Sequence, residues 1–155
     1  MKVQFASDLH LEFKENRNYL QKNPLSVSGD VLVLAGDIGL LGRDDDYLPF
    51  LSWCSDNYEW TFWIPGNHEF YNGEDITKYQ DIEEEVKPNV FLVNNKVMHY
   101  AGVNFILSTG ISKISPEKTL IVQKYLNDFK YINYSKEKFT VNHMTSNYEK
   151  LYSRV

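Results

Sequence analysis

DVLVLAGD, residues 30–37, is the stretch from which the fold of this chain follows. An apolar run that ends in glycine and a carboxylate is typical of a strand buried on both faces of a parallel sheet. Two similar runs flank it in the sequence. KVQFA at 2–6 precedes Asp8-Leu9-His10, and WTFWIP at 60–65 precedes Gly66-Asn67-His68-Glu69. We therefore expect three neighbouring strands, each followed at once by side chains that can bind a cation.

The first half of the chain predicts alternating strands and helices, the arrangement of α/β layered folds. Helical spacing of apolar residues predicts a helix over 44–57, with the acidic run Asp44-Asp45-Asp46 in its first turn. The same spacing predicts a helix over 74–86, on which the acidic residues 83–85 would form a solvated face. Residues 14–23 are polar and predict a loop. The expected strands are 3–6, 31–35 and 61–64.

The second half of the chain has a different pattern of residues. Short β-type runs at 90–93, 97–101 and 103–107 are separated by Asn94-Asn95 and by Gly102, which predicts hairpin strands at the sheet edge or in a second sheet. After Pro116 the pattern is helical, and a last helix is expected to follow Thr140 as its cap and to reach Val155. Because that pattern still runs at the last residue, we expect the C-terminal part of the fold to be missing.

Composition bounds the class of protein. The 155 residues are 43% hydrophobic and 24% charged and contain no linker, so a single domain over 1–155 is expected. The net charge of −5 argues against a basic face for phosphate backbones, although a bound divalent cation would still attract an anionic substrate. Cys54 is the only cysteine, which fits a reducing compartment. Without an apolar run of membrane-span length or a signal segment, we expect a cytoplasmic protein with no membrane partner.

The three polar blocks carry ligand types that suit a divalent metal. Asp8 and His10 are separated by one residue, so they would point to the same side if the first strand continued through them. Asp37 follows the second strand, and its two oxygens can bridge two cations. Asn67 offers an amide oxygen after the third strand, while His68 points elsewhere and is free to act as an acid. Because the carboxyl ends of parallel strands meet at one edge, these residues predict a site for Mn, Fe or Zn.

Each block alone is a weak signal, but all three in this order, roughly thirty residues apart, form a specific pattern. Asp8-x-His10, Gly36-Asp37 and Gly66-Asn67-His68-Glu69 resemble the calcineurin-like metallophosphoesterase superfamily. The run SDLHLEF at 7–13 is especially similar to small bacterial phosphoesterases of that group. The resemblance implies an α/β fold, an αββα sandwich, that holds two divalent metals.

The resemblance also implies roles for individual residues. Asp8 and His10 would hold the first metal, Asp37 would bridge both metals, and Asn67 would hold the second. His68 would be the general acid that protonates the leaving-group oxygen, with Asp37 helping to orient it. The implied reaction is hydrolysis of phosphate mono- or diesters by a metal-activated water, with two cations about 3.5–4 Å apart stabilising the attacking and leaving oxygens.

The second half of the family supplies three further histidines in Gly-His or Thr-His and Gly-His-x-His blocks. The chain has four histidines, and the two not yet placed are His99, in a hairpin strand, and His143, in the last helical pattern. Neither matches those blocks, so the chain resembles only the N-terminal portion of the family. One metal is then expected, or two if a partner completes the site.

Three functions remain open at this point. The first is a metallophosphoesterase-type hydrolase acting on a phosphate ester. The second is a catalytically impaired remnant that binds a metal or a phosphate ligand. The third is one half of a split or oligomeric enzyme, since an uncovered sheet edge favours a homo-oligomer or a complementing subunit. Nucleic acid stays open as a substrate, although the sequence offers no basic face for it. Ser108-Thr109-Gly110 is expected to face the site.

Overall fold

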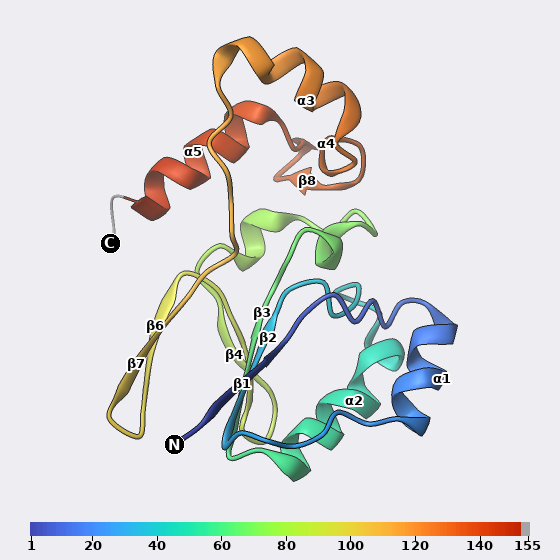
Figure 1. Cartoon of the computed structure of the whole chain (residues 1–155). Coiled ribbons are helices and arrows are strands. Elements are labelled where there is room, and N and C mark those ends of the chain that lie inside the picture. The colour runs from blue at the N-terminus through green and yellow to red at the C-terminus, as the bar shows by residue number, and fades with distance from the viewer. Residues whose placement is uncertain (153–155) are drawn as a thin grey trace.

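A five-stranded sheet carries the fold (Figure 1). The computed structural model describes residues 1–152. Strands β1, β2, β3 and β5 are parallel, and β4 pairs antiparallel with β5 at the edge opposite β1. In spatial order the strands are β1 (Val3–Ala6), β2 (Val31–Ala35), β3 (Trp60–Ile64), β5 (Val90–Val93) and β4 (Glu83–Lys87). The predicted α/β class is confirmed, and β2 lies inside the sheet as its apolar sequence required.

Helices cover one face of this sheet. In Figure 1, α1 (Lys14–Lys22) and α2 (Asp44–Asn57) lie on the same side. The predicted bounds of the second of these helices are confirmed. It buries Tyr47, Phe50, Leu51 and Cys54 in a core shared with Leu32, Leu34 and Trp63 of the sheet. Its three acidic residues occupy the first turn, where they interact favourably with the helix dipole.

A hairpin covers part of the opposite face. Strands β6 (Lys96–Tyr100) and β7 (Val103–Leu107) pair with each other in a separate two-stranded sheet. Ala101 and Gly102 connect them, with φ of 47° and 78°. A two-residue turn needs positive φ at such positions if it is to match the twist of the two strands. Met98 and Phe105 of the hairpin pack on Phe62 of β3. Since adjacent residues in a strand face opposite sides, Phe62 and Trp63 belong to two different cores.

The remaining segment, residues 116–152, lies beyond the carboxyl ends of the parallel strands (Figure 1). We call it the helical segment. It packs through Phe129, Ile132, Phe139 and Val141 into the same core as α2. Its elements are η3 (Pro116–Lys118), α3 (Thr119–Tyr125), α4 (Asp128–Tyr131), β8 (Asn133–Tyr134), β9 (Glu137–Lys138) and α5 (Val141–Tyr152), and two 3-10 turns, η1 (His68–Phe70) and η2 (Ile76–Tyr79), belong to the segment that follows β3.

The cap of the last helix follows the prediction. The Thr140 hydroxyl oxygen accepts a hydrogen bond from the His143 backbone N–H at 3.3 Å, and α5 begins at Val141. The predicted continuation to Val155 lies outside the described residues.

Three predictions were wrong. The hairpin predicted at Asn94-Asn95 does not form, because β5 pairs with β3 and β4 whereas β6 pairs with β7 in the other sheet. Residues 14–22 form α1 instead of a loop. None of its residues is buried, and side-chain contacts to groups outside the helix hold it. Asn16 Nδ2 donates to the carbonyl of Leu9 in the preceding loop at 2.9 Å, and Arg17 pairs with Asp46 of α2 at 2.7 Å. Periodicity could not reveal contacts of this kind.

The predicted helix over 74–86 is instead the short η2 turn followed by β4. Residues 83–87 pair with β5, so ladder hydrogen bonds outweigh their helical spacing. The acidic residues 83–85 are solvent-exposed, as predicted, but on an edge strand. Charged residues on an edge strand disfavour pairing with other chains.

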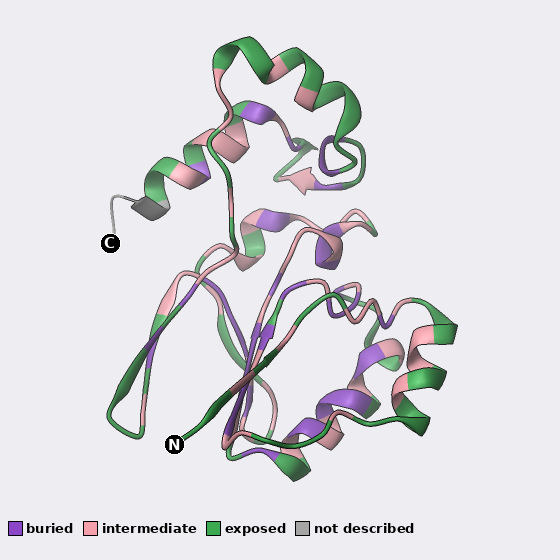
Figure 2. Cartoon of the chain, in the orientation of Figure 1, coloured by how far each residue is buried: buried purple, intermediate pink, exposed green. Residues whose placement is uncertain are grey.

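Burial follows this architecture. Figure 2 shows the buried residues concentrated in the central strands and on the inner side of α2, whereas α3 is largely exposed. Phe5, on the edge strand β1, remains 80% exposed. Among residues 1–152, no helix combines the length and apolar character that crossing a membrane requires.

The buried thiol of Cys54 provides a test of this packing. Its side chain is fully buried, and burial raises the pKa of the thiol to about 12. We expect the native protein to react with a thiol reagent at about pH 8 at least about 100-fold more slowly than the urea-unfolded chain, because only opening exposes the sulfur. The stability that this burial contributes is present at neutral pH and falls as the pH rises toward the raised pKa.

The matched control is Asp56→Cys in a Cys54→Ser background, since position 56 is exposed on the same helix. That variant should react at the rate of an unfolded thiol. Rapid labelling of native Cys54 would contradict the packing of α2 on the sheet.

Candidate metal centre

The loops that follow β1, β2 and β3 meet at one edge of the sheet. The Asp8 N–H donates to the Gly36 carbonyl at 3.1 Å, and the His10 N–H donates to the Asp37 carbonyl at 3.0 Å. These bonds extend the pairing of β1 with β2 beyond the strands, so the first two polar blocks lie side by side.

Asp8, His10 and Asp37 form one cluster of ligand atoms. One side-chain donor atom of each lies within 4.8 Å of the others. Asp8 and His10 do not share a strand face as expected, because β1 ends at Ala6. All three residues instead have left-handed backbone, with φ of 57°, 47° and 57°. Such φ values cost on the order of 1 kcal/mol or more for a residue with a side chain, and they concentrate at functional sites. Here they occur at the three residues whose side-chain donor atoms cluster.

Two glycines allow the loops after β2 and β3 to come this close. Gly36 has φ of +88°, and a Cβ there would lie 3.0 Å from the Gly66 Cα. A Cβ on Gly66 would collide with the Asp37 carboxylate. That carboxylate accepts the His68 backbone N–H at 3.0 Å. Asp37 thus fixes the backbone of the third block, whereas the His68 ring has a different polar neighbour.

That neighbour is Glu12, which the sequence analysis did not single out. Its Oε1 lies 3.1 Å from His10 Nδ1 and 3.3 Å from His68 Nδ1, and the two imidazole rings are 4.4 Å apart in an edge arrangement. His10, Glu12 and His68 therefore form a second cluster of possible ligands that shares His10 with the first.

The donor set fits a divalent cation. Carboxylate and imidazole groups suit Mn, Fe and Zn. In addition, Glu12 Oε2 is buried and has no hydrogen-bond partner within residues 1–152. A buried carboxylate oxygen without a donor is unfavourable unless a ligand satisfies it.

Glu69 stabilises the loops of the site but belongs to neither cluster of possible ligands. The side chain is fully buried, and each oxygen accepts two N–H groups. These are the backbone N–H groups of Ile38, Asp37 and Gly66 and the indole N–H of Trp63, at 2.8–3.0 Å. Burial raises the pKa of Glu69, while the bonds from Ile38, Trp63 and Asp37 act in the opposite direction. The carboxylate joins the loop after β2 to the loop after β3.

A cavity of about 720 Å³ lies between this edge of the sheet and the helical segment. Asp8, Asp37 and Asn67 line one part of it, together with Ser108, Thr109 and Gly110. Thr109 is anchored there, because its hydroxyl donates to the Pro65 carbonyl at 2.7 Å. The apolar part of the lining comes from Ile76, Ile111, Ile114, Val122, Leu126, Ile132, Phe139 and Met144. The loop 108–110 thus faces the candidate site, as its place after β7 led us to expect.

The other two histidines lie apart from these clusters. His99 is exposed on β6 and contacts Asn104 across the hairpin. The His143 ring stacks on Tyr134 at 3.9 Å. Neither belongs to a candidate metal cluster in the part of the chain that the structure describes.

Comparison with known proteins gives three matches. The family model described as calcineurin-like phosphoesterase matches residues 1–154. An uncharacterized protein of Acanthamoeba polyphaga mimivirus is 33% identical over 146 residues, which cover 84% of this chain and 51% of the viral protein. The crystal structure of phosphopantetheinyl hydrolase from Mycobacterium tuberculosis has a TM-score of 0.63 at 14% identity, over 99% of this chain and 62% of that one.

The structural match is a likeness of fold, because its sequence identity is low. The chain spans about half the length of its viral relative and under two thirds of the hydrolase. The match to the family model, by contrast, extends over nearly the whole chain and includes all three polar blocks.

The role of Glu69 can be tested by Glu69→Gln. A glutamine has one acceptor oxygen, so two of the four N–H donors would face an NH₂ group. Since each buried unsatisfied donor costs about 1–3 kcal/mol, we expect the free energy of unfolding in urea to fall by about 3 kcal/mol. Glu83→Gln, on the exposed face of β4, is the control and should leave stability unchanged. A change below about 1 kcal/mol for Glu69→Gln would mean that Glu69 does not hold the two loops together.

Proposed function

This chain belongs to the calcineurin-like phosphoesterase family, and on that premise we propose that it is a metal-dependent hydrolase of phosphate mono- or diesters. The observation that carries the proposal is the convergence of Asp8, His10 and Asp37 at the carboxyl ends of parallel strands. Open α/β sheets bind their ligands at this edge.

In the proposed enzyme, Asp8, His10 and Asp37 would hold one divalent cation, and Asp37 and Asn67 would hold a second. Manganese, iron and zinc all suit these donors. A divalent cation in such a site activates water and stabilises charge on the phosphoryl oxygens. The left-handed backbone at Asp8, His10 and Asp37 accompanies the clustering of their donor atoms.

His68 is the proposed general acid. Glu12 contacts its Nδ1, so the proton given to the leaving-group oxygen would come from Nε2. Tyr71 stacks on the same ring at 4.3 Å, and the Asp37 carboxylate holds the His68 backbone. These contacts limit the orientations of the ring, which a proton donor requires.

The competing function is a metal-binding domain without turnover. It is favoured by the small number of donors at the second metal position, for which the proposal names two, the side-chain oxygens of Asp37 and Asn67. Hydrolysis measured on the chain distinguishes the two functions, since a domain without turnover would be stabilised by Mn²⁺ but would leave phosphate esters intact.

The first prediction of the enzyme proposal concerns Asp37→Asn. With added Mn²⁺, we expect the native chain to hydrolyse p-nitrophenyl phosphate or bis-p-nitrophenyl phosphate, and the variant to lose at least about 100-fold in kcat/KM, because a bridging negative charge is removed. Asp56→Asn, exposed at the far end of α2, serves as the matched control and should retain native activity. If native protein and Asp37→Asn show the same rate, the enzyme proposal is wrong.

We further propose that the substrate carries an uncharged, largely apolar group beside its phosphate. The cavity joins carboxylates at one part to isoleucine, leucine and valine side chains of the helical segment at the other. No lysine or arginine of residues 1–152 lines it. A chain of phosphates would find no basic partner there. An alkyl or aryl group would be removed from water, which favours binding by about 25 cal/mol per Å² of apolar surface buried.

Leu126→Glu tests the apolar wall. We expect the native chain to favour p-nitrophenyl phenyl phosphate over the p-nitrophenyl ester of thymidine 5′-phosphate, which has the same leaving group. The variant should lose about tenfold in kcat/KM for the phenyl ester, because a carboxylate would replace an apolar contact. Leu120→Glu, 84% exposed on α3 and outside the cavity lining, should change neither rate. Equal losses in the two variants would contradict the proposed binding mode.

A further inference from the structure

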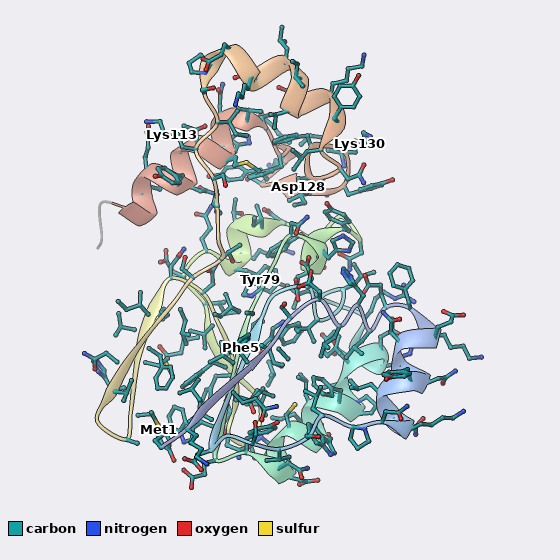
Figure 3. The ribbon with its side chains drawn as sticks, in the orientation of Figure 1. Met1, Phe5, Tyr79, Lys113, Asp128 and Lys130 are labelled. Carbon is teal, nitrogen blue, oxygen red and sulfur yellow. The ribbon has the colours of Figure 1, made fainter. Side chains whose placement is uncertain are left out.

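Asn67 is bound on its amide side by two residues that no motif includes. Its Nδ2 donates to the Tyr71 hydroxyl oxygen at 2.8 Å and to Asp128 Oδ1 at 2.9 Å. Tyr71 in turn donates its hydroxyl hydrogen to the same Asp128 oxygen at 2.6 Å. We call these three residues the Asn67 triangle. Figure 3 labels Asp128 at the margin of the helical segment that faces the segment after β3.

The triangle decides which way the amide points. Nδ2 is the donor to both partners, whose oxygens lie on the same side of the nitrogen. If the amide were turned over, its carbonyl oxygen would face the carboxylate oxygen of Asp128, and two acceptors would oppose each other without a hydrogen between them. The hydrogen-bond network therefore favours one orientation, in which the Asn67 carbonyl oxygen is directed away from Asp128.

The direction of the Tyr71 bond is fixed as well. A carboxylate oxygen can only accept, so the Tyr71 hydroxyl hydrogen is donated to Asp128 at 2.6 Å, while the hydroxyl oxygen accepts from Asn67 at 2.8 Å.

Asp128 is an unusual choice for a purely structural contact. It belongs to α4, it is 6% exposed, and among residues 1–152 the side chains that donate to it are a neutral amide and a neutral hydroxyl. A carboxylate that is buried against neutral partners is expensive, and an apolar residue could join the helical segment to the sheet at lower cost. What a carboxylate provides, and an apolar residue does not, is an acceptor that orders the amide of Asn67.

We propose that Asp128 is a positioning residue: together with Tyr71, it holds the amide of Asn67 so that the carbonyl oxygen is presented to a cation shared with Asp37. Asp128, Asn67 and Asp37 line the same cavity. The helical segment thus contributes to the second metal position without supplying a ligand. The inference rests on the proposed function, which gives Asn67 its role as a ligand.

A double-mutant cycle on Mn²⁺ binding tests this. Free Mn²⁺ is measured by its electron paramagnetic resonance signal during titration of the native chain, Asn67→Ala, Asp128→Ala and the double variant. We expect Asp128→Ala to weaken the binding of the more weakly bound Mn²⁺ by about 10–100-fold, which is the usual effect of removing a residue that orients a ligand. Asn67→Ala removes the proposed ligand itself and should weaken the binding of that Mn²⁺ at least as much. The double variant should bind as Asn67→Ala does, because Asp128 acts through Asn67.

Two further variants control for folding. Lys130→Ala lies on α4 and is exposed, so it should bind Mn²⁺ as the native chain does. Tyr71→Phe removes the hydroxyl but keeps the ring that stacks on His68. It should weaken the binding of the same Mn²⁺ ion that Asp128→Ala affects. It also provides the test if Asp128→Ala does not fold.

The outcomes separate this inference from the proposed function. If Asn67→Ala weakens Mn²⁺ binding and Asp128→Ala does not, the inference is overturned and the metal site stands. A loss from Asp128→Ala that persists in full in the Asn67→Ala background also overturns it, since Asp128 would then act independently of Asn67. If the native chain binds no Mn²⁺, both the proposed function and the inference fail.

Discussion

The site depends first on one buried carboxylate. Glu69 accepts four N–H groups, and they come from the loop after β2, the loop after β3 and the Trp63 indole. An ionised carboxylate is the side chain that can accept four such bonds and donate none. Because Asp37 and Gly66 each donate to it through the backbone, the carboxylate sets the distance between the second and third polar blocks. The close approach of Gly36 and Gly66 follows from the same constraint.

This constraint also explains why strained backbone persists around the site. Asp8, His10 and Asp37 all have positive φ, which is unfavourable for residues with side chains. Such conformations survive where surrounding structure determines them. Here the loop after β1 is bonded to the loop after β2, and that loop is bonded to Glu69. The strain is therefore distributed over a connected network in which the three candidate ligand side chains converge.

The sequence predicted those parts of the fold whose signal is local. The apolar run of β2, the acidic first turn of α2 and the glycine between β6 and β7 each act on their immediate neighbours, and each prediction was confirmed. The helix at 14–22 depends on contacts outside itself, such as the ion pair of Arg17 with Asp46, and the edge strand at 83–87 depends on pairing with β5, the next strand along the chain. The periodicity of apolar residues within one segment records neither kind of contact, so it gave the wrong element. The same division holds in the site. Glu12 lies within the quoted SDLHLEF run, but nothing local indicates that it contacts His68, which is 56 residues away in the sequence.

The two proposed metal positions differ in what they require of the chain. Asp8, His10 and Asp37 are brought together by the loops after β1 and β2, whose bonds to each other are backbone bonds near the sheet. Asn67 is different, since its amide is held by Asp128, 61 residues later in the sequence and in the helical segment. The first position is thus complete once the central strands pair. The second also needs the helical segment docked over the cavity, so any movement of α4 would change the orientation of one ligand while leaving the other three in place.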